Sequence, residues 1–320
     1  MGKCLITKFT GISVGNTNLP VLGKIRVMFT GTDNKNGASI TGHLTLKGST
    51  ATWKGDGTCN IGTPIGDLPY NVDPDKNAKG ILLIDSKKDI SLISSTWGYG
   101  TKVYFSDINK YCSSLTKLLL GNTEQDGDLS EIADLSSLET LDVGSSKVTG
   151  SFANAAYLQN LKTLNISKNN KIVCSLSDLS SCYALIDLNV EYSSVTGDLS
   201  ALSLCANLKS LSTEGSGITG SISSLANIKS FIKYSSYSKP NTWSSPSLRP
   251  SSYPKITGSI KFVKASDTDN FIINMASCTD EGITDKAWFF QSSHRTSASD
   301  AAVSTLQNAG YTLSQLITDK

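Results

Sequence analysis

The residues that could carry chemistry are few and lie far apart in the sequence. The chain has two histidines, His43 and His294, and neither belongs to a nucleophile motif such as G-x-S-x-G. The stretch 55–58, Gly-Asp-Gly-Thr, could suggest a phosphate or calcium loop, yet it lacks the lysine of a P-loop and the oxygen ligands of an EF-hand. Because Asp-Gly favours a tight turn between strands, we interpret this stretch as a hairpin turn.

The cysteines also argue against a metal or redox centre. They are odd in number, irregularly spaced and without a C-x-x-C pair: Cys4, Cys59, Cys112, Cys174, Cys182, Cys205 and Cys278. Cys112, Cys174, Cys182 and Cys205 fall at or near apolar positions of a repeat described below. We therefore expect buried, reduced thiols that act as small hydrophobic side chains, and we predict neither a metal site nor a cofactor.

Carboxylates recur at polar positions of the same repeat. Paired carboxylates can hydrolyse glycosidic bonds, but a solvated, mildly acidic face explains their positions better. We predict that this face is an exposed strand face available for binding, and that the protein is not an enzyme. Its candidate residues are Asp142, Asn165, Asp187, Glu191, Tyr192 and Glu214.

These positions depend on one pattern that is repeated five times between residues 115 and 228. Its anchor leucines recur at a nearly constant spacing of about 23 residues, which indicates a solenoid in which each copy forms one coil. The anchors are Leu118, Leu141, Leu164, Leu188 and Leu211. Each anchor has an apolar residue three positions earlier, and in the first four copies another follows two positions later.

The two halves of each copy have different periods. The first half, L-x-x-L-x-L, alternates like a strand with one buried face. The second half has an apolar residue at every third position, as in Leu129, Ile132 and Leu135, which fits 3₁₀ turns better than α-helix. A column of mostly small polar residues follows the strands, and we expect it to bond the backbone of neighbouring coils: Thr123, Ser146, Asn169, Ser193 and Ser216.

The pattern resembles leucine-rich repeats, strongly over about 115 residues. A more specific motif recurs within the chain: Val-Thr-Gly-Ser-Phe at 148–152, Val-Thr-Gly-Asp-Leu at 195–199, and Ile-Thr-Gly-Ser-Ile at 218–222 and 256–260. This wording, and both ends of the chain, are similar to V-T-G-repeat proteins carried by phages of Bacteroides, including crAss-like phages. The resemblance implies a phage surface or structural protein.

The sequence outside the repeats predicts two flanking parts. Residues 1–84 contain short β-prone runs separated by turn signals, which predicts a small all-β module. The runs are Cys4–Phe9, Lys24–Thr30, Ser39–Leu46, Ala51–Lys54 and Gly80–Ile84. We expect the solenoid at 85–285 and a strand-helix-strand cap at 286–320, with Gly310 ending the helix. The predicted fold class is thus a β-rich α/β solenoid with a 3₁₀ or coil convex side, preceded by the all-β module and closed by the cap.

The sixth copy is predicted to be interrupted. Its strand would be 228–231, and its turn sequence returns only at 256–260, which leaves an insertion at 234–254 rich in proline and aromatic residues. Insertions in repeat proteins map to loops that often bind, although such a loop could equally cover the coil. The candidate binding loop comprises Tyr234, Tyr237, Trp243, Arg249 and Tyr253.

Composition limits the possible partners. A net charge of +2 and three arginines give no basic patch, which argues against nucleic acid. The sequence has no apolar run near the ~20 residues that span a bilayer, and its start lacks the apolar region of a secretory signal. We therefore expect synthesis in a host cytoplasm and no membrane insertion.

These observations lead to one leading hypothesis of function and one alternative. The first is a non-enzymatic phage virion protein, in a head or tail fibre or decorating the capsid, that contacts the host or environment through its repeat surface. Residues 1–84 would then hold other virion proteins or sister subunits in a homo-oligomer. The alternative is a bacterial cell-surface or secreted adhesin that recognises protein or glycan.

Overall fold

The structure, a computed structural model, divides into two compact units, Met1–Gly150 and Ser151–Lys320. Side chains of residues 1–91 and of some later segments are outside the description. The described residues are 24–30, 43–46, 51–56, 59–61, 70–74, 79–85, 92–96, 101–153, 158–225, 228, 232–235, 242–244, 256–262, 264–277 and 286–319.

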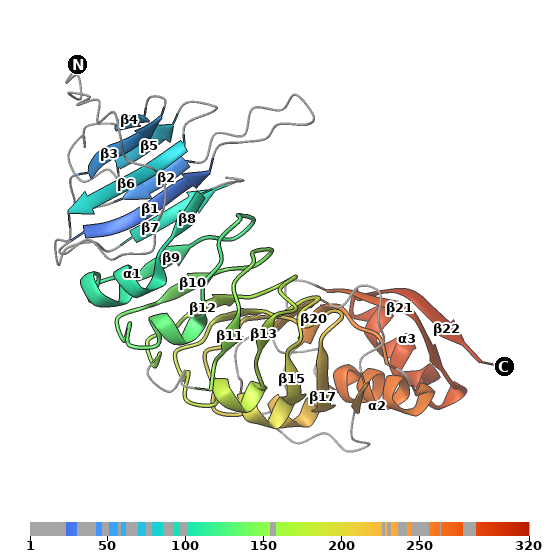
Figure 1. The fold of residues 1–320 in the computed structure, drawn as a ribbon. Helices are drawn as coiled ribbons and strands as arrows, with labels where there is room; N and C mark the ends of the chain where they lie inside the picture. Colours follow the sequence, from blue (N-terminus) through green and yellow to red (C-terminus); the bar gives the residue numbers. More distant parts are fainter. Residues whose placement is uncertain are drawn as a thin grey trace. The chain divides into compact units, whose positions relative to one another are not determined.

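Unit 1 (Met1–Gly150) contains two sheets (Figure 1). Its strands are β1 Lys24–Thr30, β2 His43–Leu46, β3 Ala51–Asp56, β4 Cys59–Ile61, β5 Tyr70–Pro74, β6 Lys79–Asp85, β7 Leu92–Thr96, β8 Thr101–Val103, β9 Lys117–Leu119 and β10 Thr140–Asp142. One sheet is antiparallel with the order β3-β6-β1-β8. The other has the order β4-β5-β2-β7-β9-β10, antiparallel up to β7 and parallel from β7 onward.

The short strands expected in residues 1–84 are present where the structure describes them, and β1 has the predicted bounds. The expected hairpin at Gly55-Asp56 is wrong, because β3 pairs with β6 whereas β4 pairs with β5. Asp-Gly is thus a link between two sheets here. The run expected at Cys4–Phe9 lies outside the described residues.

Parallel strands begin in this unit at β7, which pairs with β9 in register. Helix α1 (Phe105–Tyr111) lies between β8 and β9, and its Phe105 and Ile108 are buried. The 3₁₀ turn η1 (Leu129–Ile132) follows at the predicted triplet positions. Asp128 begins this turn by accepting from the amide of Ser130, while Glu131 reaches back to the amide of Asp128, so both form a capping box.

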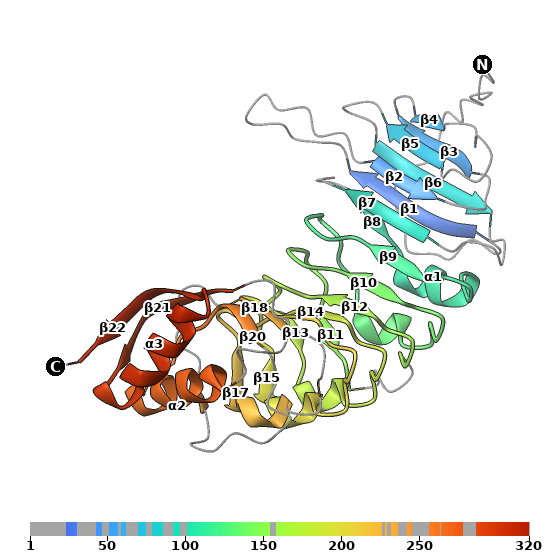
Figure 2. The ribbon, with the colours of Figure 1, turned by 180° about the vertical axis from the view of Figure 1, so that it is seen from behind.

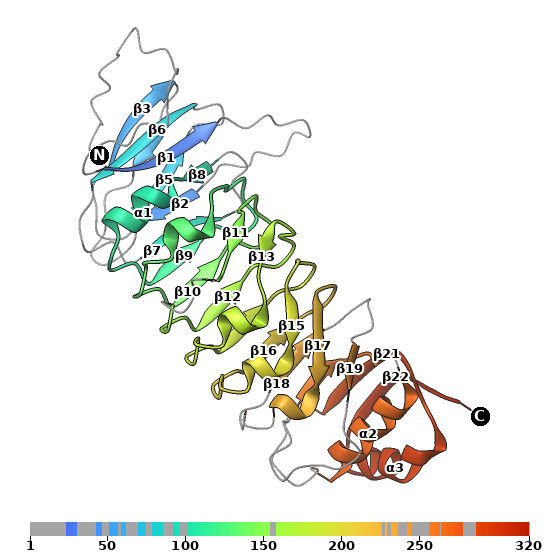
Figure 3. The same ribbon diagram turned by 60° about the horizontal axis from the view of Figure 1, so that its bottom comes forward.

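Unit 2 (Ser151–Lys320) carries the later coils on two parallel sheets. The first has the order β22-β21-β20-β18-β16-β14-β12, and its strands β12, β20, β21 and β22 are labelled in Figures 1 and 2. Their bounds are β12 Thr163–Asn165, β14 Asp187–Asn189, β16 Ser210–Ser212, β18 Ile232–Ser235, β20 Ile256–Ser259, β21 Ala287–Arg295 and β22 Thr312–Thr318. The second sheet, β15-β17-β19, is seen in Figure 3, with β15 Thr196–Asp198, β17 Gly217–Ser221 and β19 Thr242–Ser244.

Short 3₁₀ turns close the coils, as the triplet spacing predicted. They are η3 Leu176–Leu179, η4 Leu199–Leu202 and η5 Ile222–Leu225, and two further short strands are β11 Gly150–Ser151 and β13 Ile172–Val173. Ser175 and Asp198 begin η3 and η4 by accepting from amides two positions later. The sequence signal for these turns is therefore a serine or aspartate directly before the apolar triplets.

The core of each coil consists of stacked apolar columns. Leu164, Leu188 and Leu211 pair in register on successive strands, and their exposed fractions are 0%, 1% and 0%. Gly220 has φ +113°, and a Cβ placed on it would come 2.6 Å from a carboxylate oxygen of Asp198. Glycine is needed there both for the left-handed backbone and for the close approach of the preceding coil.

The predicted interruption of the sixth coil is wrong. Strand β18 pairs with β16 at Leu211↔Tyr234, and this step equals the step between Leu188 and Leu211 in the preceding coil. Strand β19 pairs with β17 at Gly220↔Trp243, and these two residues are as far apart in the sequence as Leu211 and Tyr234 in the first sheet.

The wording at 256–259, Ile-Thr-Gly-Ser, explains the error. It forms β20 in the first sheet, where Ile256 pairs with Ile232 as the next strand after β18. Because these residues resemble the turn sequences of earlier coils, they predict the turn of the sixth coil, and the predicted register of this coil is therefore wrong. The described parts of 234–254 thus lie in strands that continue the two sheets.

The end of unit 2 contains the expected strand, helix and strand as β21, α3 (Asp300–Asn308) and β22, with the short turn η6 (Ser297–Ser299) before the helix. Gly310 has φ +87°, and the amides of Gly310 and Tyr311 donate to the carbonyls of Gln307 and Leu306, so the helix ends in a Schellman motif. Phe271, Ile273 and Met275, which resemble a weak continuation of the repeat pattern in the sequence, lie on helix α2 (Ala265–Ala276). That these elements act as a closing cap stays a prediction.

The compact units do not coincide with the predicted bounds of 1–84, 85–285 and 286–320. Backbone pairing explains the difference at the first bound, since β2 of the predicted all-β module pairs with β7, and β7 begins the parallel strands. Independent folding of residues 1–84 stays a prediction.

Candidate binding face

The strand face of unit 2 consists of side chains that flank the buried leucines. In β12, β14 and β16 the central leucine is buried and both neighbours are half-buried, because successive side chains of a strand point to opposite sides. We define the strand face by Thr163, Asn165, Lys168, Asp187, Asn189, Glu191, Tyr192, Ser210 and Ser212. The predicted candidate Asp142 occupies the equivalent position on β10 in unit 1.

Several predicted binding residues on this face stabilise the local backbone. Oδ1 of Asp142 accepts from the amide of Gly144 at 3.0 Å, and Oδ1 of Asn165 accepts from the amide of Ser167 at 3.1 Å. Asn189 does the same for Glu191 at 3.2 Å. These Asx turns guide the chain out of each strand, so one side of each group is occupied.

The residue that follows each of these turns has a left-handed backbone. Its φ lies between 50° and 57° at Asn122, Ser145, Lys168 and Tyr192, and the fifth copy has Gly215 with φ 67°. In this column the amide of Lys168 donates to the carbonyl of Glu191 at 2.7 Å, and the amide of Tyr192 donates to that of Glu214. The column therefore extends the pairing of the strands and fixes the direction of its side chains.

At four of its five positions the expected ladder of small polar residues forms bonds within each coil, which the prediction of links to neighbouring coils did not include. The hydroxyls of Thr123, Ser146, Ser193 and Ser216 donate to the carbonyl three positions earlier in their own coil at 2.6–2.7 Å. A side chain this short reaches the preceding turn of its own chain before it reaches the next coil. Neighbouring coils are joined by other groups, such as the Thr219 hydroxyl, which donates to the Gly197 carbonyl at 3.4 Å.

Glu214 was expected on the exposed face, and this prediction is wrong. Its exposed fraction is 3%, whereas that of Tyr192 is 41%. The phenol of Tyr192 donates a hydrogen bond to Oε1 of Glu214, and the Tyr192 ring lies over Gly215, where a Cβ would come 2.7 Å from ring carbon Cδ1. Tyrosine from one coil thus covers the carboxylate of the next, a contact that the repeat alone did not indicate.

The candidate binding loop is only partly described. Tyr234 lies in β18 and Trp243 in β19, so both belong to strands of regular sheets, and the prediction that they lie in an inserted loop is wrong. Tyr237, Arg249 and Tyr253 lie outside the described residues. The structure therefore does not bring these five residues together as one site.

The four described cysteine side chains are reduced and buried, as expected. Burial raises the pKa of Cys112 and of Cys174 to about 12, and it raises the pKa of Cys182 and of Cys205 to about 11. Such thiols stay protonated at neutral pH and are poor nucleophiles. Within the described ranges, no group of three or more His, Cys, Asp or Glu residues could hold a metal ion.

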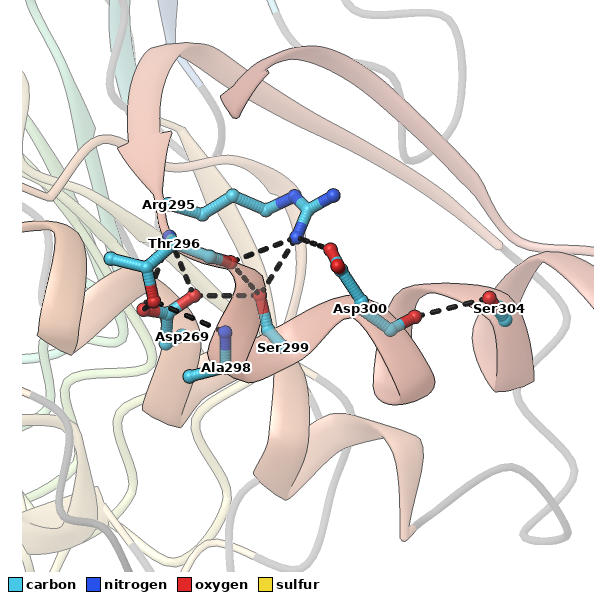
Figure 4. Close-up of polar contacts among 7 residues, drawn as sticks. All are labelled: Asp269, Arg295, Thr296, Ala298, Ser299, Asp300 and Ser304. Atoms are coloured by element: carbon cyan, nitrogen blue, oxygen red, sulfur yellow. Dashed lines mark hydrogen bonds and ion pairs between the residues drawn. The ribbon is translucent and has the colours of Figure 1, made fainter. Parts of the chain in front are cut away.

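A buried polar cluster near the end of unit 2 was not predicted (Figure 4). Asp269 of α2, with an exposed fraction of 4%, accepts from the Thr296 amide at 3.1 Å, the Thr296 hydroxyl at 2.7 Å and the Ser299 hydroxyl at 2.6 Å. Arg295 donates to the Thr296 carbonyl at 2.9 Å and to Asp300 at 2.5 Å.

This cluster fixes the start of η6 against α2, because one carboxylate satisfies three donors from the turn. The sequence signal that could have indicated it is the Thr-Ser-Ala-Ser-Asp run at 296–300, which is rich in helix-capping residues. The Asp269 carboxylate and Nη1 of Arg295 bond to groups of the same turn, while Nε of Arg295 is buried without a hydrogen-bond partner, and we interpret the cluster as structural.

Comparisons with known proteins give a likeness in backbone only. No family model and no curated protein sequence matches the chain. Among solved structures, the complex of PEPR1 with AtPEP1 has a TM-score of 0.48 and 16% identity, over 73% of this chain and 36% of that chain. A leucine-rich-repeat protein of Leptospira interrogans gives 0.43 and 16%, over 67% and 58%, and a plant ice-binding protein gives 0.36 and 16%, over 52% and 64%.

The chain thus spans about a third of the length of the PEPR1 chain. The nearly constant repeat period, the parallel strands and the 3₁₀ turns are those of a leucine-rich-repeat solenoid. No helix in the described part of the chain is long and apolar enough to cross a membrane.

Proposed function

We propose that this chain is a non-enzymatic binding protein that recognises its partner through the strand face. The observation that carries the proposal is the contrast, within each coil, between buried leucines and the partly exposed residues that flank them. Leucine columns are buried, while the flanking positions differ from coil to coil on a rigid parallel sheet: Thr163 and Asn165, Asp187 and Asn189, Ser210 and Ser212. Repeat solenoids bind through such extended surfaces.

We further propose that the protein is displayed on a phage particle, in a head or tail fibre or decorating the capsid, after synthesis in the host cytoplasm. Support comes from the sequence Val-Thr-Gly at 148–150 and 195–197 and its variant Ile-Thr-Gly at 218–220, which resemble the repeats of phage-borne proteins. Residues 1–84 would contact other virion proteins or sister subunits, and the strand face would contact the host surface. Mass spectrometry of purified particles tests this placement; presence of the chain only in the envelope fraction of uninfected bacteria would favour the adhesin instead.

Binding through the strand face is tested separately with labelled full-length protein on host cells. Ser212→Arg places a long, charged side chain in the middle of the face, so we expect cell binding to fall about tenfold or more through steric exclusion. The matched control is Ala206→Arg, at an exposed position in the turn after η4. Equal loss for both variants, or none for Ser212→Arg, would refute the assignment of the face.

A further inference from the structure

Tyr192 is a preorganised aromatic platform on the strand face. The phenol is held by Glu214, whose side chain is buried, and the ring rests over Gly215. The left-handed backbone at φ 50° fixes the direction of the side chain at its root. The Tyr192 side chain is restrained at its backbone, at its hydroxyl and at its ring. It therefore loses little conformational entropy when a ligand stacks on the exposed part of the ring.

The strand face offers one aromatic ring in a polar setting. The other large hydrophobic side chains that are exposed among the described residues lie elsewhere: Val173 on β13, Tyr183 and Leu204 in turns after η3 and η4, Ile273 on α2 and Ile317 on β22. A protein interface depends on a cluster of large anchors within a patch of about 800 Å² per partner. One ring surrounded by small and polar side chains is too small an anchor for such an interface.

The same arrangement suits a sugar ring. The apolar face of a pyranose presents polarised C–H groups, and these are attracted to the negative face of an aromatic ring. Lys168 occupies the position equivalent to Tyr192 in the preceding coil and is exposed. Asn189, Glu191 and Ser212 of the strand face flank Tyr192. These side chains supply the donors and acceptors that sugar hydroxyls need.

Charge narrows the class of sugar. Glu191 directly precedes Tyr192 and the buried Glu214 accepts from its phenol, against the single cation Lys168 in its column. Acidic sugars would be repelled by this balance. Resting on the proposed function of the strand face, we infer that Tyr192 stacks on a pyranose ring of a neutral polysaccharide, with Glu214 as a positioning residue.

The test uses full-length protein in affinity gel electrophoresis with dextran, a β-glucan and an α-mannan as neutral probes and polygalacturonate as the acidic probe. We expect at least one neutral polymer to retard the protein more than polygalacturonate does. Tyr192→Gln removes the ring but keeps a donor for Glu214, so the fold is retained and affinity should fall about tenfold. Tyr192→Phe keeps the ring without the anchor and should lose less.

Tyr183→Ala is the matched control, since it removes an exposed tyrosine outside the strand face and should leave retardation unchanged. Three results would overturn the inference: no retardation by any neutral polymer, equal retardation of Tyr192→Gln and wild type, or a preference for polygalacturonate. If none of the polymers binds while Ser212→Arg still abolishes cell binding, the glycan inference fails and the proposed function of the face stands.

Discussion

At the scale of single residues, the strand face shows that one side chain often has both a local and an outward role. Asn165 and Asn189 each use one oxygen to hold the backbone of their own coil. Tyr192 is different, because its anchor lies on the next coil and much of its ring remains exposed. Binding specificity is thus expected to depend on few positions, and the buried leucines beneath them to determine whether the face exists at all.

The residue-scale prediction concerns those leucines. Leu164→Asp would place an unpaired carboxylate in a column where the exposed fraction is 0%, and we expect a loss of more than about 3 kcal/mol in the free energy of unfolding. Leu204→Asp is the control, because Leu204 is 58% exposed and its substitution should change stability little. Denaturant unfolding of both variants measures the difference; equal midpoints for Leu164→Asp and wild type would show that the proposed register is wrong.

At the scale of elements, the coil is the unit of the structure, and the sixth coil obeys the same step as the others. Its strands β18 and β19 continue both sheets, and each pairs with its counterpart in the previous coil at the same separation in sequence. Each coil contacts its neighbours through sheet pairing and stacked turns. Its stability therefore depends on the number of residues per coil staying the same.

The prediction at this scale compares two deletions. Removing 235–253 takes less than one step and cuts into β18 and β19, so we expect a large loss of stability. Removing 233–256 takes one complete step and joins the chain in register, since Lys233 pairs with Thr257. This variant should keep cooperative unfolding by circular dichroism. Similar melting of both variants would indicate that 235–253 is a dispensable loop after all.

At the scale of the whole molecule, the N-terminal strands are expected to do more than close the solenoid. A cap of about 30 residues would shield one end, and residues 1–84 exceed that need. Yet β2 pairs with β7, so these residues also cover an edge of the parallel sheet in unit 1. Attachment and edge protection can therefore reside in the same segment.

The corresponding prediction uses light scattering on the full chain and on a chain beginning at Ser86. We expect the full chain to be a homo-oligomer through residues 1–84. The shortened chain exposes the edge of β7 and should lose the defined oligomer, with aggregation through that edge. A monomer in both cases, together with no binding of residues 1–84 to particles, would exclude the attachment role.

The repeat pattern alone predicts the five coils between residues 115 and 228, whereas packing of the folded chain sets how their polar groups are used and where the sixth coil lies. Leucines at a nearly constant spacing predict buried columns and 3₁₀ triplets, because this period places the apolar side chains of every coil on the same side, where they can be buried together. Similar wording at 256–259 and 218–221 occurs in different sheets, since short polar strands have no strong preference between them. The burial of Glu214 under Tyr192 and the capture of Thr296 by Asp269 required coordinates, because partners so far apart in the sequence meet only after the coils and helices have packed.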